Sequence, residues 1–193
     1  MKDVMNFSDG RKIFFTSDTH FFHKKIITYA NRPFLSVEEM NQALVDNWNS
    51  VVPRDGIVFH LGDFSFGGKT QWNTIRKKLN GKIYLILGNH DFSRYDHSWE
   101  QMFKRVTQQM RICIENQEIY LNHNPFLAFG GSYSGTWDLF GHVHSGPNEK
   151  NGKDLPRLEH LFPTQYDVGV DNNDFRPVSF YEIREIINKR NIK

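Results

Sequence analysis

Short apolar runs alternate with amphipathic stretches along the first half of the chain. Residues 11–17, 56–61 and 82–87 are mostly apolar and end in polar or glycine-containing turns, which is typical of buried strands. Between them, residues 37–52 and 70–79 carry apolar side chains at helical spacing. Strands that alternate with helices in this way indicate an α/β fold.

The pattern changes in the second half, where the predicted strands lie closer together. Residues 111–114 and 118–122 are expected to form a hairpin that turns at Asn116 and Gln117. Another short apolar run, at residues 139–140, leads directly into a glycine and two histidines. This spacing favours antiparallel pairing, so that both parallel and antiparallel strands are expected.

The last part of the chain predicts a strand at residues 166–170 and a helix from Pro177 to about Asn188, because proline is favoured in the first turn of a helix. The sequence contains no internal repeat, low-complexity tract or linker. We therefore expect one domain over residues 1–193, built as an α/β sandwich of mixed sheets.

The composition is that of an ordinary globular protein, with 38% hydrophobic and 24% charged residues. The net charge of +2 is too small to indicate nucleic-acid binding by itself. No apolar run approaches the roughly 18 residues of a membrane helix, and the N-terminus lacks a signal-peptide pattern. Cys113, the single cysteine, excludes an internal disulfide and a cysteine-based zinc site, so a reducing, cytoplasmic environment is expected.

Polar motifs follow the predicted strands at five places. Ligands of open α/β sheets bind outside the carboxyl ends of the strands, so these motifs are expected to meet in one crevice. Gly62, Gly88 and Gly141 precede three of them and permit tight turns directly after a strand. The motifs contain seven side chains of metal-binding type: Asp18, His20, Asp63, Asn89, His123, His142 and His144.

Carboxylate, imidazole and amide groups without thiolate suit Mn²⁺, Fe, Zn²⁺, Ni²⁺ or Co²⁺. Seven groups are too many for one tetrahedral site, but they are enough for two open sites that share a bridging carboxylate. The alternative is that these residues only cap strand ends and turns. That alternative does not predict the ordered set of motifs.

The ordered motifs resemble those of the calcineurin-like metallophosphoesterase superfamily, whose pattern is D-x-H, G-D, G-N-H-D/E, a later H and G-H-x-H. The match spans about residues 11 to 145, and no core position is missing. Residues 15–27, 60–67 and 168–178 resemble, more narrowly, small single-domain bacterial and phage phosphoesterases of this superfamily.

The resemblance implies a four-layer αββα sandwich, with two mixed sheets faced by helices. It also implies two divalent metal ions, Mn²⁺ foremost, bridged by Asp63. One ion is assigned Asp18, His20, Asp63 and His144, and the other Asp63, Asn89, His123 and His142. His90 is implied as the group that stabilises a phosphoryl oxygen or protonates the leaving group. Asp91 is implied to orient the His90 imidazole, with an N-cap role as the alternative.

Several neighbouring residues have two interpretations. His23 and Arg32 are candidates to face a bound phosphate, with a helix cap and a surface ion pair as the respective alternatives. Tyr133 or Trp137 is a candidate to stack on a substrate base, with packing of a lid as the alternative. Among residues expected to have no role in the chemistry, we expect His60 in the core, His160 in solvent and Asp171 in a turn.

The expected function is hydrolysis of a phosphate ester, by in-line attack of a hydroxide that bridges the two ions. A phosphodiester with a small, nucleotide-like structure is favoured, because His90 suits protonation of a poor leaving group and the chain is too short for an added nucleic-acid-binding domain. Phosphomonoesterase and nuclease activity on polynucleotides are the enzymatic alternatives. A protein-interaction scaffold without catalysis is the alternative of another class.

Overall fold

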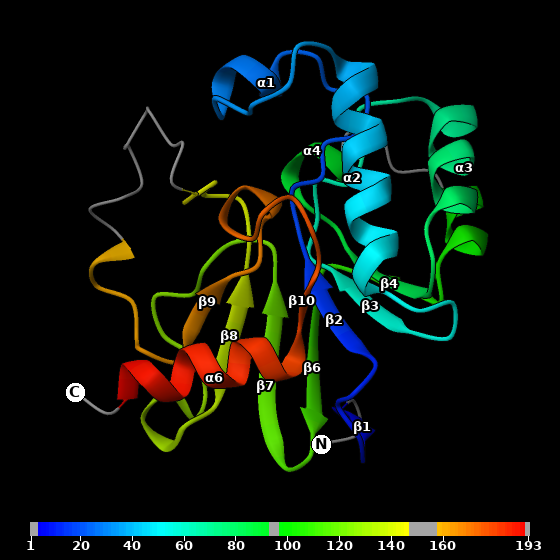
Figure 1. The fold of residues 1–193 in the computed structure, drawn as a ribbon. Coiled ribbons are helices and arrows are strands. Elements are labelled where there is room, and N and C mark those ends of the chain that lie inside the picture. The colour runs from blue at the N-terminus through cyan, green and yellow to red at the C-terminus, as the bar shows by residue number, and fades with distance from the viewer. Residues whose placement is uncertain (1–3, 93–96, 147–157, 192–193) are drawn as a thin grey trace.

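Two five-stranded sheets form the centre of the molecule (Figure 1), in a computed structural model that describes residues 4–92, 97–146 and 158–191. The first sheet has the order β1 (Val4–Phe7), β6 (Gln109–Ile114), β7 (Gln117–Asn122), β8 (Trp137–Phe140) and β9 (Gln165–Asp167). The second has the order β10 (Val178–Ser179), β2 (Ile13–Thr16), β3 (Ile57–His60), β4 (Lys82–Ile86) and β5 (Arg105–Thr107).

Both sheets are mixed. In the first sheet β6 and β7 pair antiparallel, while the other neighbours pair parallel. In the second sheet β10 runs antiparallel to β2, and β2, β3, β4 and β5 are parallel. The α/β architecture of two mixed sheets with helices, which the sequence predicts, is therefore confirmed.

Helices α2 (Val37–Val51) and α3 (Lys69–Lys78) cover one face of the second sheet (Figure 1). The Ser36 hydroxyl accepts a hydrogen bond from the Glu39 N–H at 3.1 Å, as expected for the start of α2. The core under these two helices contains buried side chains of both helices and of the sheet, among them Met40, Leu44, Trp48, Trp72, Ile75, Val58 and Ile83.

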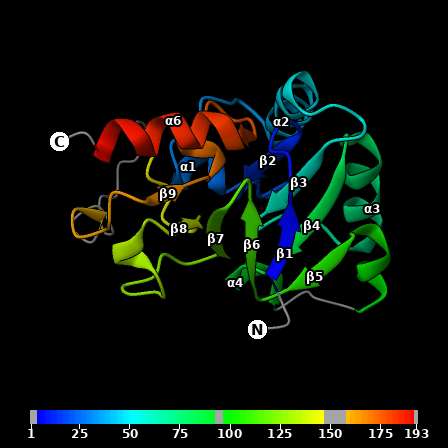
Figure 2. The same ribbon diagram turned by 90° about the horizontal axis from the view of Figure 1, so that it is seen from below.

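A second core fills the space between the two sheets. Ile13, Phe15 and Phe59 of the second sheet pack there against side chains of the first sheet such as Ile112, Leu121 and Leu139. Helix α6 (Phe180–Asn191) adds Phe180, Ile183 and Ile187 to the same core. It contacts β2, β9 and β10, so it lies along the edge strands of both sheets (Figure 2).

The remaining helical elements are short. They are α1 (Ile26–Tyr29), α4 (Asn89–Phe92) and the 3₁₀ helices η1 (His97–Met102), η2 (Ser132–Ser134) and η3 (Val170–Asn172). Among the described residues, none of the helices combines the length and the apolar character that crossing a bilayer requires.

Three local features differ from the sequence-based expectation. Strands β1 and β5 were not predicted, because they are short and lie at or near sheet edges, where pairing with a neighbour rather than an apolar pattern defines them. The hairpin turns at Glu115 and Asn116, one residue earlier than expected, and both adopt positive φ, 49° and 67°. Cys113 lies on β6 and is half-buried, whereas a small apolar residue on a strand is expected in the core.

Candidate metal centre

The predicted ligands are brought together from the ends of strands in both sheets. Asp18 and Asp63 lie just beyond β2 and β3, and Asn89 begins α4 after β4, so the parallel pairing of these strands places all three at one edge of the second sheet. His123 follows β7 and His142 follows β8 in the first sheet, and these two strands are also parallel. The two edges meet at a single site.

Asp18 is fully buried and offers one oxygen to the site. Its Oδ2 atom accepts hydrogen bonds from the Ser17 hydroxyl at 2.5 Å and from the His142 N–H at 2.9 Å. Its Oδ1 atom lies 3.9 Å from Nε2 of both His20 and His144. Asp18, His20 and His144 therefore form a first group of atoms arranged around a common point.

Asp63 lies between this group and a second one. Its Oδ2 atom is 3.5 Å from His20 Nε2 and 3.6 Å from His123 Nε2. The Asn89 Oδ1 atom lies 2.9 Å from His123 Nε2 and 3.0 Å from His142 Nδ1. The Asp63 carboxylate therefore lies between His20 of the first group and His123 of the second.

The residues present fit a divalent cation. Within the described part of the chain, Asp18 Oδ1 and His20 Nε2 are buried and have no hydrogen-bond partner. An unsatisfied buried polar atom costs about 1–3 kcal/mol, so a group that supplies the missing partner stabilises this arrangement. Burial holds the pKa of His20 well below its usual range and also lowers that of His142. Both imidazoles are therefore neutral, which is the form that binds a metal.

The backbone at the ligands is in an unusual conformation. Five ligand residues adopt positive φ, between 49° and 72°, namely Asp18, His20, Asp63, His142 and His144. Residues other than glycine rarely adopt this region, and each such residue costs on the order of 1–3 kcal/mol. Strain of this kind persists where surrounding structure enforces it, and here it turns the side chains toward the common site.

At two glycines the backbone lies directly against a carboxylate of the site, that of Asp63 or that of Asp18. A Cβ atom on Gly88 would lie 2.2 Å from Asp63 Oδ1, and one on Gly141 would lie 2.3 Å from Asp18 Oδ2. Gly62 adopts φ of +99°, which an L side chain rarely adopts. Glycines at these three positions are therefore required by the close approach of neighbouring loops.

Hydrogen bonds orient two of the histidines. His123 Nδ1 lies 2.7 Å from the Leu61 carbonyl oxygen, to which it donates, so its Nε2 lone pair faces the site. His144 Nδ1 lies 2.7 Å from Asp171 Oδ2. Burial alone would lower the pKa of His144, but the bond to Asp171 and the nearby charge of Asp18 outweigh it and raise this pKa to about 9.

The comparisons with known proteins agree with this geometry. The sequence model of the calcineurin-like phosphoesterase family matches residues 11–180. The chain belongs to this family. An uncharacterised protein of Methanocaldococcus jannaschii, MJ1445, is 34% identical over 182 residues, covering 93% of each chain. The gene 66 protein of Mycobacterium phage L5 is 30% identical, covering 90% of this chain and 93% of the phage protein.

A solved structure is similar along nearly its whole length. The protein of unknown function AQ665 from Aquifex aeolicus has a TM-score of 0.68 and 25% identity, with coverage of 90% of this phosphoesterase-family chain and 98% of the Aquifex chain. The likeness supports the arrangement of the sheets. Neither it nor the two relatives identifies a substrate.

In this member of the calcineurin-like family, His90 lies at the accessible edge of the centre. Its side chain is 45% exposed, and Nε2 is 4.0 Å from Asp63 Oδ2. Its ring lies beside those of Phe66 and His20, with centroid distances of 4.8 and 5.6 Å. His90 is thus accessible from solvent at the edge of the centre.

The Asp91 carboxylate is buried and is bonded to the backbone. Its carboxylate accepts hydrogen bonds from the N–H groups of Asp63, Phe64 and Gly88, at 2.7 to 3.0 Å. These bonds fix the loop that carries Asp63. Burial raises the pKa of Asp91 to about 7. The orienting role that the resemblance implies stays a prediction. The N-cap alternative does not describe these bonds, because their donors all precede Asp91 in the sequence.

Arg32 and His23 differ in how they relate to the centre. The Arg32 guanidinium is buried and paired with Asp171, and it also donates to the carbonyl oxygens of Asp18 and Thr19 at 2.6 and 3.1 Å. Arg32 was expected to face a bound phosphate, but its guanidinium donates to these internal groups instead. His23 Nδ1 lies 3.3 Å from His20 Nδ1, and its ring stacks on Phe66 with centroids 3.6 Å apart.

Tyr133 and Trp137 lie in different environments, and His60 lies in the core. Trp137 is 3% exposed and packs on Phe180, whereas Tyr133 is 92% exposed and contacts Phe162. His60 is buried, as predicted, and its Nε2 atom lies 2.9 Å from the Thr19 hydroxyl.

Two buried carboxylates contact residues of the centre, although the sequence did not predict this role for them. Asp171 was expected only in a turn, yet it contacts His144 and Arg32. Asp167 accepts hydrogen bonds from the Ser145 N–H and hydroxyl, at 3.1 and 2.6 Å, next to His144. A signal was present in the sequence, since both are acidic residues within an apolar stretch that is predicted to be buried.

Proposed function

We propose that this protein hydrolyses a phosphate ester with the help of two divalent ions, Mn²⁺ foremost, held by Asp18, His20, Asp63, Asn89, His123, His142 and His144. The observation that carries the proposal is a pair of buried atoms beside the Asp63 carboxylate, Asp18 Oδ1 and His20 Nε2, which have no hydrogen-bond partner among the described residues. Bound ions of this kind activate water as the nucleophile and offset the charge of the phosphoryl group.

The side chains of the protein complete the chemistry. In this proposal Asp63 would bind both ions, Asp18 would bind one of them, and Asn89 would bind the other. His90 Nε2 carries the proton that stabilises a phosphoryl oxygen or passes to the leaving oxygen, a contribution of about 10²–10⁴-fold. Its partial exposure leaves it in reach of a substrate that approaches from solvent.

We propose a phosphodiester of small, nucleotide-like size as the preferred substrate. An alkoxide is a poor leaving group and benefits most from a proton donor such as His90. The alternatives are a phosphomonoester and a polynucleotide, and neither has a specific structural observation in its favour. An interaction scaffold without catalysis is disfavoured by the complete set of ligand residues.

The test is turnover by the purified protein after removal of bound metals with a chelator and reloading with single divalent ions. Bis(p-nitrophenyl) phosphate, p-nitrophenyl phosphate and single-stranded DNA serve as the three substrates. We expect the diester to be hydrolysed fastest with Mn²⁺. Absence of turnover with every ion, together with absence of metal uptake, would contradict the proposal and favour the scaffold.

A further inference from the structure

A pocket of about 410 Å³ lies next to the metal centre and shares one residue with it. His142, a proposed metal ligand, forms part of its lining. Most of the other side chains that line it are apolar, including Phe126, Leu127, Val143 and Leu161. The volume lies within the range of about 300–1,000 Å³ that is usual for small-molecule sites.

The two walls of the pocket are fixed by one buried side chain of β9. Gln165 is 2% exposed, and its Nε2 atom donates to the Phe126 carbonyl at 2.9 Å and to Asp138 at 2.7 Å. Its Oε1 atom accepts from the Phe162 N–H at 2.9 Å. The Phe126 N–H is in turn held by Asp138 at 3.1 Å. Both segments that border the pocket are therefore anchored to the first sheet, and a ligand meets a preformed surface.

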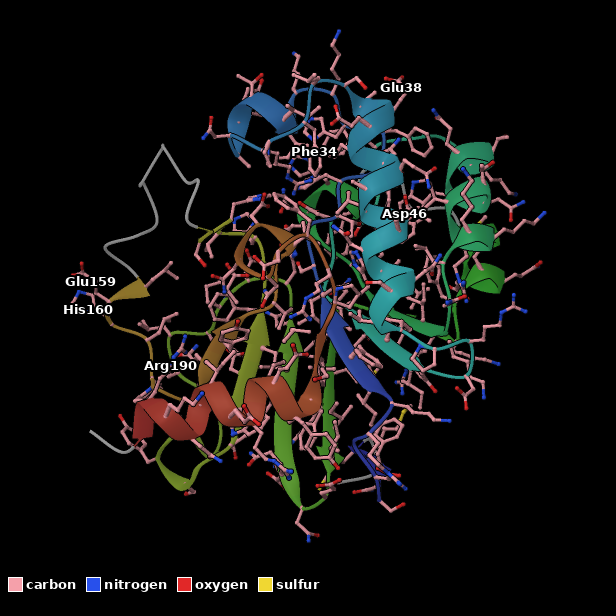
Figure 3. The ribbon with its side chains drawn as sticks, in the orientation of Figure 1. Phe34, Glu38, Asp46, Glu159, His160 and Arg190 are labelled. Atoms are coloured by element: carbon pink, nitrogen blue, oxygen red, sulfur yellow. The ribbon has the colours of Figure 1, made fainter. Side chains whose placement is uncertain are left out.

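The rim of the pocket exposes apolar surface to water. Leu127 is 89% exposed although it is a large apolar residue. His160, the polar residue on the opposite segment, extends from the outer side of the molecule (Figure 3). Among the described residues that line the pocket, the polar side chains other than His142 are Asn124 and His160. A strongly polar group would therefore lose water contacts here and gain few hydrogen bonds.

We propose that this pocket holds the organic group of the phosphate ester and favours a flat, largely apolar ring. The inference rests on the proposed function, because it places the phosphoryl group at the metal centre. His142 lies at the boundary between the two, so a ring joined to the phosphoryl group through one ester oxygen extends from the centre onto Val143 and Leu161. A small acyclic alcohol would leave Leu127 exposed.

Binding of phosphonates to the Mn²⁺-loaded protein, measured by calorimetry, tests the proposal without turnover, because the C–P bond is not hydrolysed. The probes are inorganic phosphate, methylphosphonate and benzylphosphonate, the last of which places its ring where an aryl ester would. We expect benzylphosphonate to bind at least about tenfold tighter than methylphosphonate, since the ring removes apolar surface from water.

Two variants test whether Leu127 contributes to the binding of the ring. Leu127→Ser should reduce the advantage of benzylphosphonate by about threefold and leave the affinity for inorganic phosphate unchanged. The matched control is Leu35→Ser, at a leucine that is 97% exposed in another part of the chain, and it should change neither affinity. Both leucines are exposed, so neither change affects folding.

Failure of the pocket assignment and failure of the proposed function would give different binding results. Equal binding of benzylphosphonate and methylphosphonate, with inorganic phosphate still bound, overturns the pocket assignment alone. An equal effect of Leu127→Ser and Leu35→Ser also overturns it. Failure of the Mn²⁺-loaded protein to bind inorganic phosphate overturns the proposed function and the pocket assignment with it.

Discussion

Arg32 and Asp171, which are 139 residues apart in the sequence, form a two-point ion pair in the interior. The Arg32 Nε and Nη2 atoms each lie 2.8 Å from one oxygen of the Asp171 carboxylate. The same carboxylate accepts a hydrogen bond from His144 Nδ1. The pair therefore links the loop before α2 to His144, a proposed metal ligand that follows β8, and it gives the arginine a structural role.

Arg32→Met should destabilise the protein by about 3–5 kcal/mol, because it leaves the buried Asp171 carboxylate without its partner. Urea unfolding of the metal-free protein at neutral pH measures the change. Arg54→Met, at an exposed position, is the control and should stay within about 0.5 kcal/mol of the wild type. Wild-type stability combined with weaker phosphate binding would instead assign Arg32 to the substrate.

Asp171→Asn should weaken Mn²⁺ binding by about 10–100-fold, because residues that orient a metal-binding histidine typically have effects of this size. The asparagine oxygen still accepts a bond from His144 Nδ1, but it carries no charge. Calorimetric titration of the chelator-treated protein with Mn²⁺ provides the measurement. Asp174→Asn, on the same loop but exposed, is the matched control. Unchanged affinity in Asp171→Asn would show that His144 needs no orienting partner.

His90→Ala should retain both metals and lose about 10²–10⁴-fold in turnover, because it removes the proposed proton donor and no metal ligand. Asp63→Ala is the contrasting variant and should lose metal, since it removes the bridging carboxylate. Metal content by mass spectrometry and turnover of diesters with leaving groups of rising pKa separate the two effects. Full activity of His90→Ala on esters with poor leaving groups would refute the assigned role.

His60 should make the metal-free protein sensitive to acid. Burial lowers the pKa of His60 to about 3, whereas the unfolded chain binds a proton near pH 6.5. Below about pH 6.5 the unfolded state therefore binds more protons than the folded state. As the pH falls from there toward 3, the free energy of unfolding decreases by up to about 1.4 kcal/mol per pH unit. His60→Gln keeps a donor and an acceptor but does not titrate, so its stability should fall less between pH 7 and 5. Parallel pH profiles for the two proteins would contradict the prediction.

The sequence predicts the main strands and the converging ligands because their signals are local. Each motif directly follows an apolar run, and the parallel pairing of β2, β3 and β4 then places Asp18, Asp63 and Asn89 together. The motifs can be found from their order along the sequence, without knowledge of how the strands are arranged in space.

Features that depend on distant contacts could not be predicted in this way. Strands β1 and β5 exist through their pairing with β6 and β4, and at four and three residues they are too short to show a periodic pattern. The partners of Arg32 and Asp91 are backbone groups and a distant carboxylate, which residue type and spacing do not reveal. Gln165 likewise shows its role only once two loops fold over β9.

The ligand residues come from both sheets, and this has a consequence for unfolding. A cation pair held, as proposed, by Asp18 and Asp63 on one side and by His123 and His144 on the other would connect the two halves of the sandwich. The halves cannot separate without releasing the ions. Each ion should therefore raise the free energy of unfolding by about 2.7 kcal/mol at a hundredfold excess over its Kd. Chelation should lower the melting temperature accordingly, and thermal unfolding would then report metal occupancy before any substrate is known.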